Sequence, residues 1–327
     1  MNILVTGGCG FVGSHLIEYI LSQMPTVMPR SWPITVLARW WEPRVNMPDI
    51  IFDVELLEGD LTDLPSLVAA LRQAKPDIIF HLAAESFVPA SFTSPIHTLQ
   101  VNALGTVNLL EAVRLTGQDP RIVVCSSPEV YGDTDEVMTE ETPLRPVSPY
   151  ALSKTAEDRA AFMYHAAYGM KTIISRGFAH EGPGRGSVFA VSDFARQVAR
   201  IEAGLQEPVV KVGNLEAVRT YCDVRDMVRA YWLLAQKGEP GQAYNIAGDE
   251  MFSLREVLDR LLALSHIEQK VQVVVEEARL RPHDVWVQKP DDRKFRQLTN
   301  WRPEIPFART LADCLSYWRE RCGPLKP

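Results

Sequence analysis

Cysteine and histidine are scarce in this chain, and neither is arranged as a structural or metal-binding set. The 327 residues include five cysteines and seven histidines. The cysteines, far apart except for the last two, are Cys9, Cys125, Cys222, Cys314 and Cys322. These positions match neither a disulfide framework nor zinc-ligand spacing, and no histidine pair shares a helical face with a carboxylate. We therefore expect a reduced, cytoplasmic protein without a metal site.

Long apolar runs and a surplus of positive charge are also absent. No apolar run reaches the length of a membrane span, and no charged segment with an apolar stretch precedes the first strand-like run. Lys and Arg number 34 against 41 Asp and Glu, a formal net charge of −7. Such a chain has no basic surplus for nucleic acid, although a local basic pocket for one diphosphate is compatible with it. We expect no signal peptide and no binding to membranes or nucleic acid.

Short apolar runs alternate with amphipathic stretches through the first half of the chain. The strand candidates are Ile3–Val5, Ile34–Leu37, Ile78–Phe80, Ile122–Val124 and Thr172–Ile174. The helical patterns between them are Ser14–Met24, Leu64–Gln73, Val101–Leu115 and Tyr150–Tyr168. Strands separated by helices predict right-handed crossovers and an α/β fold with a doubly wound parallel sheet. Near-continuous apolar strands fit a sheet that helices cover on both faces.

The texture of the sequence changes after about residue 177. Glycine-rich and proline-bounded pieces suggest loops and short elements, whereas Val224–Gln236 is typical of a helix and Ala243–Ala247 of a strand. We expect residues 1–177 plus 220–247 to form a large dinucleotide-binding domain. Residues 178–219 plus 248–327 should form a smaller C-terminal α/β substrate domain, with one return of the chain to the large domain.

A glycine-rich turn joins the first strand to the first helix. In Thr6–Gly13, the glycines Gly7, Gly10 and Gly13 are spaced three apart. The first permits a tight turn, the second lets a pyrophosphate approach the backbone, and the third packs helix against strand. The N-terminus of the helix then offers free N–H groups to phosphates. Glycine turns are common, but this strand–turn–helix context indicates a dinucleotide site.

The end of the second strand bears on which dinucleotide binds. An acid there would hydrogen-bond the adenine ribose, but this strand ends in Leu37-Ala38-Arg39. Arg39 can pair with a 2′-phosphate, which favours NADP over NAD; otherwise it is a solvated loop residue. Asp60, after the third strand, is placed to meet the adenine or to cap the following helix.

Tyr150 and Lys154 are four residues apart on a predicted helix, so both project from one face. A tyrosine with a pKa near 10 is a poor base, but an adjacent ammonium stabilises its phenolate. Such a pair can move a proton while a nicotinamide moves a hydride. Ser126 and Ser127, directly after a predicted strand, add a hydroxyl that can bind the reacting oxygen. In isolation, a Tyr and a Lys on a helix are more often ordinary surface and core residues.

Together these features resemble the extended short-chain dehydrogenase/reductase family. The features are the Thr6–Gly13 turn, His81-Leu82-Ala83-Ala84, the serine ahead of Tyr131-Gly132 and the Tyr150-x-x-x-Lys154 helix. The similarity covers nearly the whole chain and implies a Rossmann fold with a catalytic trio of Ser127, Tyr150 and Lys154. It implies cofactor contacts from Gly7, Gly10, Phe11, Val12, Gly13, Arg39, Asp60, Leu61, Leu82, Ala83, Ala84, Tyr150 and Lys154. The implied cofactor is NADP(H), with NAD(H) as the alternative.

The C-terminal half resembles the GDP-mannose branch of this family, which holds 4,6-dehydratases and 4-keto reductases. The segments Val191–Gln197 and Val212–Arg219 carry this likeness, and Trp301–Pro306 looks most like the reductases. Where the dehydratases usually open with GxTGQDG, this chain has Gly7-Gly8-Cys9-Gly10-Phe11-Val12-Gly13. The implied substrate contacts are Glu85, Ser86, Ser127, Glu129, His180, Arg185, Lys211, Arg219 and Arg281. Arg219 and Arg281 are candidates to clamp a diphosphate or, alternatively, surface ion-pair residues.

Two departures bear on the substrate and the reaction. The dehydratases use a glutamate two residues after the catalytic hydroxyl, often with an acid or serine before it, and this chain has Ser127-Pro128-Glu129. Glu129 is therefore a candidate catalytic residue, but similar reductases also carry it. Phe178-Ala179-His180 stands where the branch normally has Phe-Asn-His, which removes one amide near the substrate.

We predict a reductase that delivers hydride from NADPH to the 4-keto group of GDP-4-keto-6-deoxy-D-mannose and forms a product of the GDP-D-rhamnose type. The main alternative is a GDP-mannose 4,6-dehydratase, followed by other nucleotide-sugar epimerases or dehydratases. A non-catalytic dinucleotide sensor would be expected to lose the Tyr–Lys pair. Relatives dimerise through helices that correspond to Val101–Leu115 and Tyr150–Tyr168, which implies a homodimer with a four-helix bundle.

Overall fold

A seven-stranded parallel sheet forms the centre of the molecule. The computed structural model describes residues 1–23, 33–47 and 51–322. The strand order is β10-β6-β5-β4-β1-β2-β3, and every neighbouring pair is parallel. The strands are β1 (Ile3–Thr6), β2 (Ile34–Ala38), β3 (Glu55–Glu58), β4 (Ile78–His81), β5 (Arg121–Cys125), β6 (Lys171–Gly177) and β10 (Ala243–Ile246). The strand order reverses between β1 and β4, which is where doubly wound sheets bind ligands.

Helices cover both faces of this sheet, as the alternation of apolar runs predicts. One face packs against α1 (Phe11–Gln23), α8 (Val224–Lys237) and α10 (Arg293–Thr299). The other packs against α2 (Leu64–Ala74), α5 (Gly105–Thr116) and α6 (Pro149–Tyr168). On β1, Val5 joins the first core and Leu4 the second, because successive side chains point to opposite faces. The predicted doubly wound sheet is confirmed.

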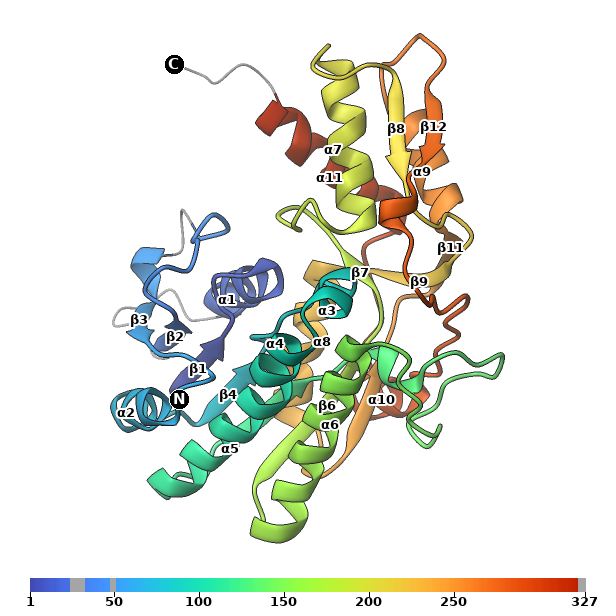
Figure 1. Cartoon of the computed structure of the whole chain (residues 1–327). Helices are drawn as coiled ribbons and strands as arrows, with labels where there is room; N and C mark the ends of the chain where they lie inside the picture. The colour runs from blue at the N-terminus through green and yellow to red at the C-terminus, as the bar shows by residue number, and fades with distance from the viewer. Residues whose placement is uncertain (24–32, 48–50, 323–327) are drawn as a thin grey trace.

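A smaller α/β region lies beyond the large sheet, at the top right of Figure 1. Its helices are α7 (Ala190–Glu202), α9 (Leu254–Ala263) and α11 (Phe307–Cys322), which share one apolar core. Beside them, β8 (Val209–Val212) pairs with β12 (Gln272–Val275) in parallel. A further sheet of β7 (His180–Glu181), β9 (Val218–Asp223) and β11 (Glu250–Ser253) lies between this region and the large sheet (Figure 1).

The C-terminal part of the chain returns to the large sheet twice. The first return, α8 and β10, was expected. The second is α10 with the residues directly after it: Phe295 in the helix and Trp301 beyond its end are buried in the core that contains α1 and α8. The Trp301 indole N–H donates to the backbone oxygen of Asp226 in α8, 3.1 Å away. The prediction kept all of 248–327 in the smaller domain, but these two rings attach part of that segment to the large sheet.

A buried ion pair joins α6 to β6. The Arg176 guanidinium donates to both carboxylate oxygens of Asp158, at 2.8 and 3.1 Å, and both side chains are almost fully buried. Arg176 also donates to the Tyr131 hydroxyl at 3.0 Å and to the backbone oxygen of Glu140 at 2.9 Å. The guanidinium is therefore surrounded by acceptors, as a buried charge requires.

Replacing Asp158 by Asn should destabilise the protein strongly, because it leaves the buried Arg176 charge without a counter-ion. We expect the free energy of unfolding to fall by about 3–5 kcal/mol in urea denaturation. The matched control is Asp119→Asn, which breaks the exposed pair with Lys171 and should cost at most ~1 kcal/mol. Equal losses in the two variants would contradict this account.

Candidate active site

Two adjoining cavities open at the carboxyl ends of the large sheet's strands. The first, about 490 Å³, is lined by the loops after β1, β2, β3 and β4. The second, about 630 Å³, lies between the sheet and the smaller region. Both volumes are in the range of small-molecule sites. The side chains that line both cavities are Ser86, Ser126, Tyr150, His180, Arg185 and Phe189. A ligand in one cavity can thus meet a ligand in the other at Tyr150.

The glycine turn forms one wall of the first cavity. Gly7 has a φ of +71°, and a Cβ on it would lie 2.8 Å from the backbone nitrogen of Ala83. A Cβ on Gly13 would lie 2.3 Å from the Gly7 oxygen. The turn is therefore closed against β1 and the loop after β4, and Gly10, Phe11 and Val12 line the cavity at the start of α1. This backbone cradle at a helix N-terminus fits the diphosphate of a dinucleotide.

Polar and aromatic groups after β2 line the adenosine end expected for such a cofactor. Arg39 lines the cavity, with its guanidinium 5.6 Å from the ring centre of Trp41. Glu42 accepts a hydrogen bond from the Arg39 backbone N–H at 3.2 Å. The sequence interpretation missed Trp41 and Glu42, which lie in a turn after the strand that alternation does not describe. Asp60 also lines the cavity and accepts from the Thr62 backbone N–H at 2.8 Å.

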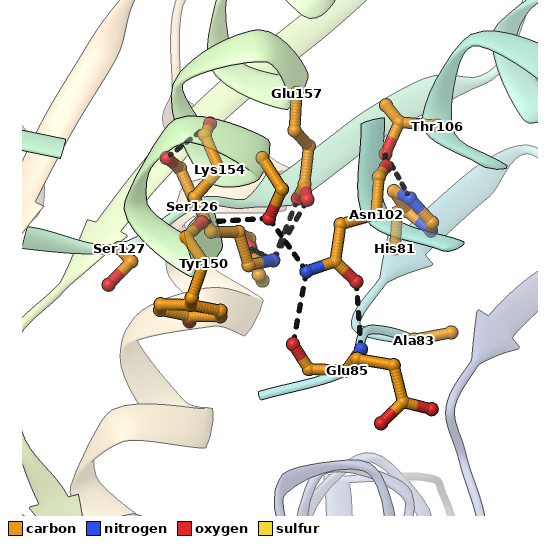
Figure 2. A network of polar contacts seen from close by, with 12 residues as sticks. His81, Ala83, Glu85, Asn102, Thr106, Ser126, Ser127, Tyr150, Lys154 and Glu157 are labelled. Atoms are coloured by element: carbon orange, nitrogen blue, oxygen red, sulfur yellow. Dashed lines mark hydrogen bonds and ion pairs between the residues drawn. The ribbon is translucent and has the colours of Figure 1, made fainter. Parts of the chain in front are cut away.

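The loop after β4 supplies the opposite wall of the first cavity. The residues predicted in this loop all line the cavity, namely Leu82, Ala83, Ala84, Glu85 and Ser86, as does Leu61 after β3. Asn102 holds this loop: its side-chain amide accepts from the Glu85 backbone N–H at 2.8 Å and donates to the Glu85 backbone oxygen at 3.0 Å (Figure 2). The same amide donates to the Ser153 hydroxyl of α6 at 2.9 Å.

Asn102 lies in a single π-helical turn, Gln100–Leu104, between α4 (Pro95–Leu99) and α5. π turns inside helices often occur at functional sites. Its side chain is fully buried, so both ends of the amide need partners. The sequence interpretation missed Asn102 because it treated Val101–Leu115 as one regular helix.

Tyr150 and Lys154 lie in the first turns of α6. Ser148 caps this helix by accepting from the Ala151 N–H at 3.0 Å, and Pro149 occupies its first position. Tyr150 is buried between the two cavities, and Lys154 lines the first. Burial raises the pKa of the Tyr150 phenol, and the Lys154 ammonium and the Ser127 hydroxyl oppose this. The predicted pair on one helical face is present.

A buried carboxylate that the sequence interpretation missed faces Lys154. The ammonium donates to both oxygens of Glu157, at 3.0 and 2.9 Å, and to the backbone oxygen of Cys125 at 2.7 Å. Burial raises the pKa of Glu157 to about 7, against the effect of Lys154. Burial would lower the pKa of Lys154, but Glu157 outweighs it and the pKa is raised.

The second cavity contains Ser127, Pro128 and Glu129, which follow β5. Glu129 accepts a hydrogen bond at 3.2 Å from the amide of Gln288, which is buried and comes from the C-terminal segment. Pro128 lies between the hydroxyl and the carboxylate and has no protic side chain. On this wall the Ser127 hydroxyl can orient a substrate carbonyl and Glu129 presents a carboxylate, but Pro128 between them cannot donate a proton.

His180 and Arg185 lie where the two cavities meet. Burial lowers the pKa of His180 to about 4, and the Arg185 charge adds to this. The Arg185 guanidinium lies 4.0 Å from the Phe189 ring centre, and its Nε is 3.3 Å from a Glu181 carboxylate oxygen. His180 is therefore neutral at physiological pH, and Arg185 provides the positive charge here.

Arg219 and Arg281 line the second cavity, as predicted, but Lys211 is not among the lining residues of either cavity. The Lys211 ammonium instead pairs with Glu276 at 2.7 Å. Its neighbours Val210 and Val212 point into the core of the smaller region, so the strand turns Lys211 outward. Arg281 pairs with Asp284 at 3.4 Å, so the ion-pair alternative describes its contact in this structure.

Within residues 1–23, 33–47 and 51–322, no group of three or more His, Cys, Asp or Glu side chains could hold a metal ion. The same part of the chain has no helix long and apolar enough to cross a membrane.

Comparison with known proteins decides the family. Residues 4–314 match the family described as GDP-mannose 4,6 dehydratase. The chain belongs to this family. The GDP-mannose 4,6 dehydratase family is part of the extended short-chain dehydrogenases/reductases, which confirms the resemblance drawn from the glycine turn and the Tyr–Lys pair. Its members are nucleotide-sugar oxidoreductases and dehydratases, so the prediction of an enzyme is also confirmed.

Relatives within this family differ in activity. GDP-6-deoxy-D-mannose reductase of Pseudomonas aeruginosa is 33% identical, over 98% of each chain. GDP-mannose 4,6 dehydratase 1 of Arabidopsis thaliana is also 33% identical, over 94% of this chain and 87% of the relative. Sequence identity therefore does not distinguish a reductase from a dehydratase, and the distinction depends on the residues of the site.

Solved structures agree with the fold over nearly the whole chain. RMD from Pseudomonas aeruginosa, complexed with NADPH, is 31% identical with a TM-score of 0.82 and covers 98% of this chain and 99% of its own. The dTDP-glucose 4,6-dehydratase DesIV from Streptomyces venezuelae, with NAD bound, is 30% identical with a TM-score of 0.86 and covers 98% and 97%.

Proposed function

We propose that this chain reduces the 4-keto group of GDP-4-keto-6-deoxy-D-mannose with NADPH and forms a product of the GDP-D-rhamnose type. The observation that carries the proposal is Pro128, which lines the substrate cavity between Ser127 and Glu129. Elimination of water requires a proton for the leaving hydroxyl, and a proline there cannot give one. Reduction needs only a hydride donor and one acid, and Tyr150 between the cavities supplies the acid.

The residues act on the ketone from one side. A reduced nicotinamide dinucleotide, held in the first cavity by the glycine turn and Lys154, would supply the hydride. Ser127 donates a hydrogen bond to the carbonyl oxygen, and Tyr150 transfers its phenolic proton to the same oxygen as negative charge develops there. Lys154 lies on the same helical face and stabilises the phenolate that remains.

The alternative, a GDP-mannose 4,6-dehydratase, is favoured by one feature: Glu129. In that reaction it would remove the proton from carbon 5. Glu129 lines the second cavity, and its carboxylate is held there by a hydrogen bond from the Gln288 amide at 3.2 Å. The dehydratase returns its hydride to the substrate and uses no net cofactor, so the two reactions differ in a direct assay.

For the cofactor we propose NADP(H), with NAD(H) as the alternative. The P. aeruginosa RMD structure holds NADPH, and in this chain Arg39 lines the first cavity directly after β2. A guanidinium suits a 2′-phosphate through paired hydrogen bonds. Glu42 lines the same part of the cavity and opposes a second negative charge, which keeps NAD as the alternative.

For the substrate we propose that residues 178–219 and 248–327, apart from α10, bind the nucleotide sugar, and that residues 1–177 with 220–247 bind the cofactor. Arg185, Arg219 and Arg281 provide positive charge along the second cavity for a diphosphate. Glu85, Ser86 and His180 are close to the junction of the cavities and are placed to meet the sugar. Free thiols at all five cysteines support a reducing, cytoplasmic location.

We also propose a homodimer through α5 and α6. Large apolar side chains are exposed on these helices and their ends, namely Leu104, Leu115, Leu152, Phe162, Met163 and Tyr168. A second copy that places the same two helices against them would bury this face in a four-helix bundle.

The first test is NADPH oxidation by the purified protein on addition of GDP-4-keto-6-deoxy-D-mannose. We expect stoichiometric loss of nicotinamide absorbance and a GDP-6-deoxyhexose product. Tyr150→Phe should lower kcat by at least about 10²-fold and leave NADPH affinity unchanged, because only the proton donor is removed. Turnover of GDP-mannose without NADPH consumption would establish the dehydratase instead.

Arg39→Ala should lower the affinity for NADPH by about tenfold or more and leave the affinity for NADH nearly unchanged, since only the 2′-phosphate contact is lost. Fluorescence titration with each cofactor measures this. Glu42→Gln is the matched variant, and it should raise the affinity for NADPH relative to the affinity for NADH. An equal loss of affinity for both cofactors in Arg39→Ala would show that Arg39 does not bind the 2′-phosphate.

Phe162→Glu together with Met163→Lys should convert the proposed dimer to a monomer, because charges would be buried on association. Sedimentation equilibrium reports the mass. Leu264→Glu is the control: it places a charge at an exposed leucine of the smaller region and should leave the mass unchanged. A wild-type chain that sediments as a monomer would refute the proposed interface.

A further inference from the structure

The Lys154 ammonium, which stabilises a Tyr150 phenolate, forms a buried ion pair with the Glu157 carboxylate. Glu157 follows it by three residues on α6, and both of its oxygens accept from the ammonium, at 3.0 and 2.9 Å. The two side chains are 5% and 1% exposed. Figure 2 shows the Lys154 ammonium joined to the Glu157 carboxylate, with Tyr150 on the same helix. An ion pair that is this close and excluded from water interacts far more strongly than an ion pair at the surface.

The neighbouring acid has a different role. Asp158 is also buried, but its carboxylate is bound by Arg176, and the two form a separate pair between α6 and β6. Glu157 is therefore not needed for that contact. Its bidentate partner is Lys154, and it faces the same ammonium that the tyrosine uses.

The charges around Tyr150 come from several elements. Lys154 and Glu157 are on α6, Glu129 follows β5, and the Cys125 thiol ends β5. His81 on β4 is held neutral, because burial and the Lys154 charge lower its pKa to about 3. Lys154 is thus the cation that stabilises a Tyr150 phenolate in this set, and Glu157 is the carboxylate bound to it.

We propose that Glu157 is a positioning residue: it fixes Lys154 and offsets its charge, so that the Tyr150 phenol stays protonated and is set to give a proton rather than take one. A reductase needs this state. Hydride from the reduced nicotinamide, which is oxidised in the step, would add to the carbonyl carbon; the carbonyl π electron pair moves to oxygen, and the Tyr150 proton joins that oxygen. The resulting phenolate regains a proton from water. The direction of proton transfer rests on the proposed reductase function, whereas the charge arrangement does not.

The electrostatic effects have the required signs. Burial raises the pKa of Tyr150, Lys154 lowers it, and the Glu157 carboxylate raises it again. Because the pKa of Glu157 is about 7, the carboxylate is charged above that pH, where the tyrosine titrates. With Lys154 still protonated on its hydrogen bond to the Cys125 backbone oxygen, removing the carboxylate should lower the pKa of Tyr150.

The test is a titration of Tyr150 by ¹³C NMR in protein labelled at the tyrosine Cζ. The chain has nine tyrosines, and the signal lost in Tyr150→Phe identifies the one of interest. In Glu157→Gln the midpoint should move down by about one pH unit, because a negative charge next to Lys154 is gone. In Glu157→Asp, which keeps the charge but withdraws it, the shift should have the same sign and be smaller.

A midpoint that stays in place or rises in both variants would overturn the proposal. Thermal unfolding of each variant shows whether it is folded at the pH of the measurement. The titration needs no substrate, so its outcome is separate from that of the reductase assay. In the assay, the alkaline limb of kcat/KM for NADPH-dependent reduction should move to lower pH in Glu157→Gln by the same amount. A downward NMR shift without NADPH consumption by the wild type would retain the charge arrangement and overturn the direction of proton transfer.

Discussion

The parallel arrangement of the large sheet is the constraint on which the rest of the structure depends. Because every strand runs the same way, all carboxyl ends meet at one edge, and each loop that leaves them can contribute to one site. The loops after β1, β2, β4 and β5 bring together Gly7, Arg39, Ala83 and Ser127, which are distant in sequence. The chain after β6 then builds the smaller region across this edge and divides the space into two cavities.

Buried charge imposes a second constraint, concentrated on α6. This helix carries Lys154, Glu157 and Asp158 inside the protein, and each has an oppositely charged partner. An unpaired charge at such depth would cost several kcal/mol. One pair fixes α6 to β6, and the other lies beside the reacting tyrosine. Stability and chemistry therefore share one helix, and the orientation of Tyr150 depends on contacts that also hold the fold together.

Patterns of short range predicted much of this site. The glycine trio, the alternation of strands with helices, and the four-residue spacing of Tyr150 and Lys154 each depend on local geometry that the sequence states directly. The structure places nearly all the predicted cofactor and substrate residues around the two cavities. Lys211 is the exception, because the family resemblance that suggested it does not indicate which side of β8 the side chain faces.

Such local patterns could not predict residues whose partners are distant in the sequence. Asn102 joins the loop after β4 to α6, Gln288 reaches Glu129 from the C-terminal segment, and α10 returns to a sheet that the chain had already left. None of these contacts has a periodic signal, because each joins segments separated by tens of residues or more. Glu157 is near Lys154 in sequence, yet a helical spacing of three does not tell whether both side chains face inward.

The sequence by itself determined the fold class, the dinucleotide turn and the family, because these follow from local spacing and from the periodicity of apolar residues. Only the tertiary structure decided which polar groups lie within hydrogen-bond distance, which of them lost their water, and which side each strand presents to the cavity. Charges such as those of Lys154 and Glu157 depend on their surroundings for their protonation. Those surroundings exist only once α6 has packed against the sheet.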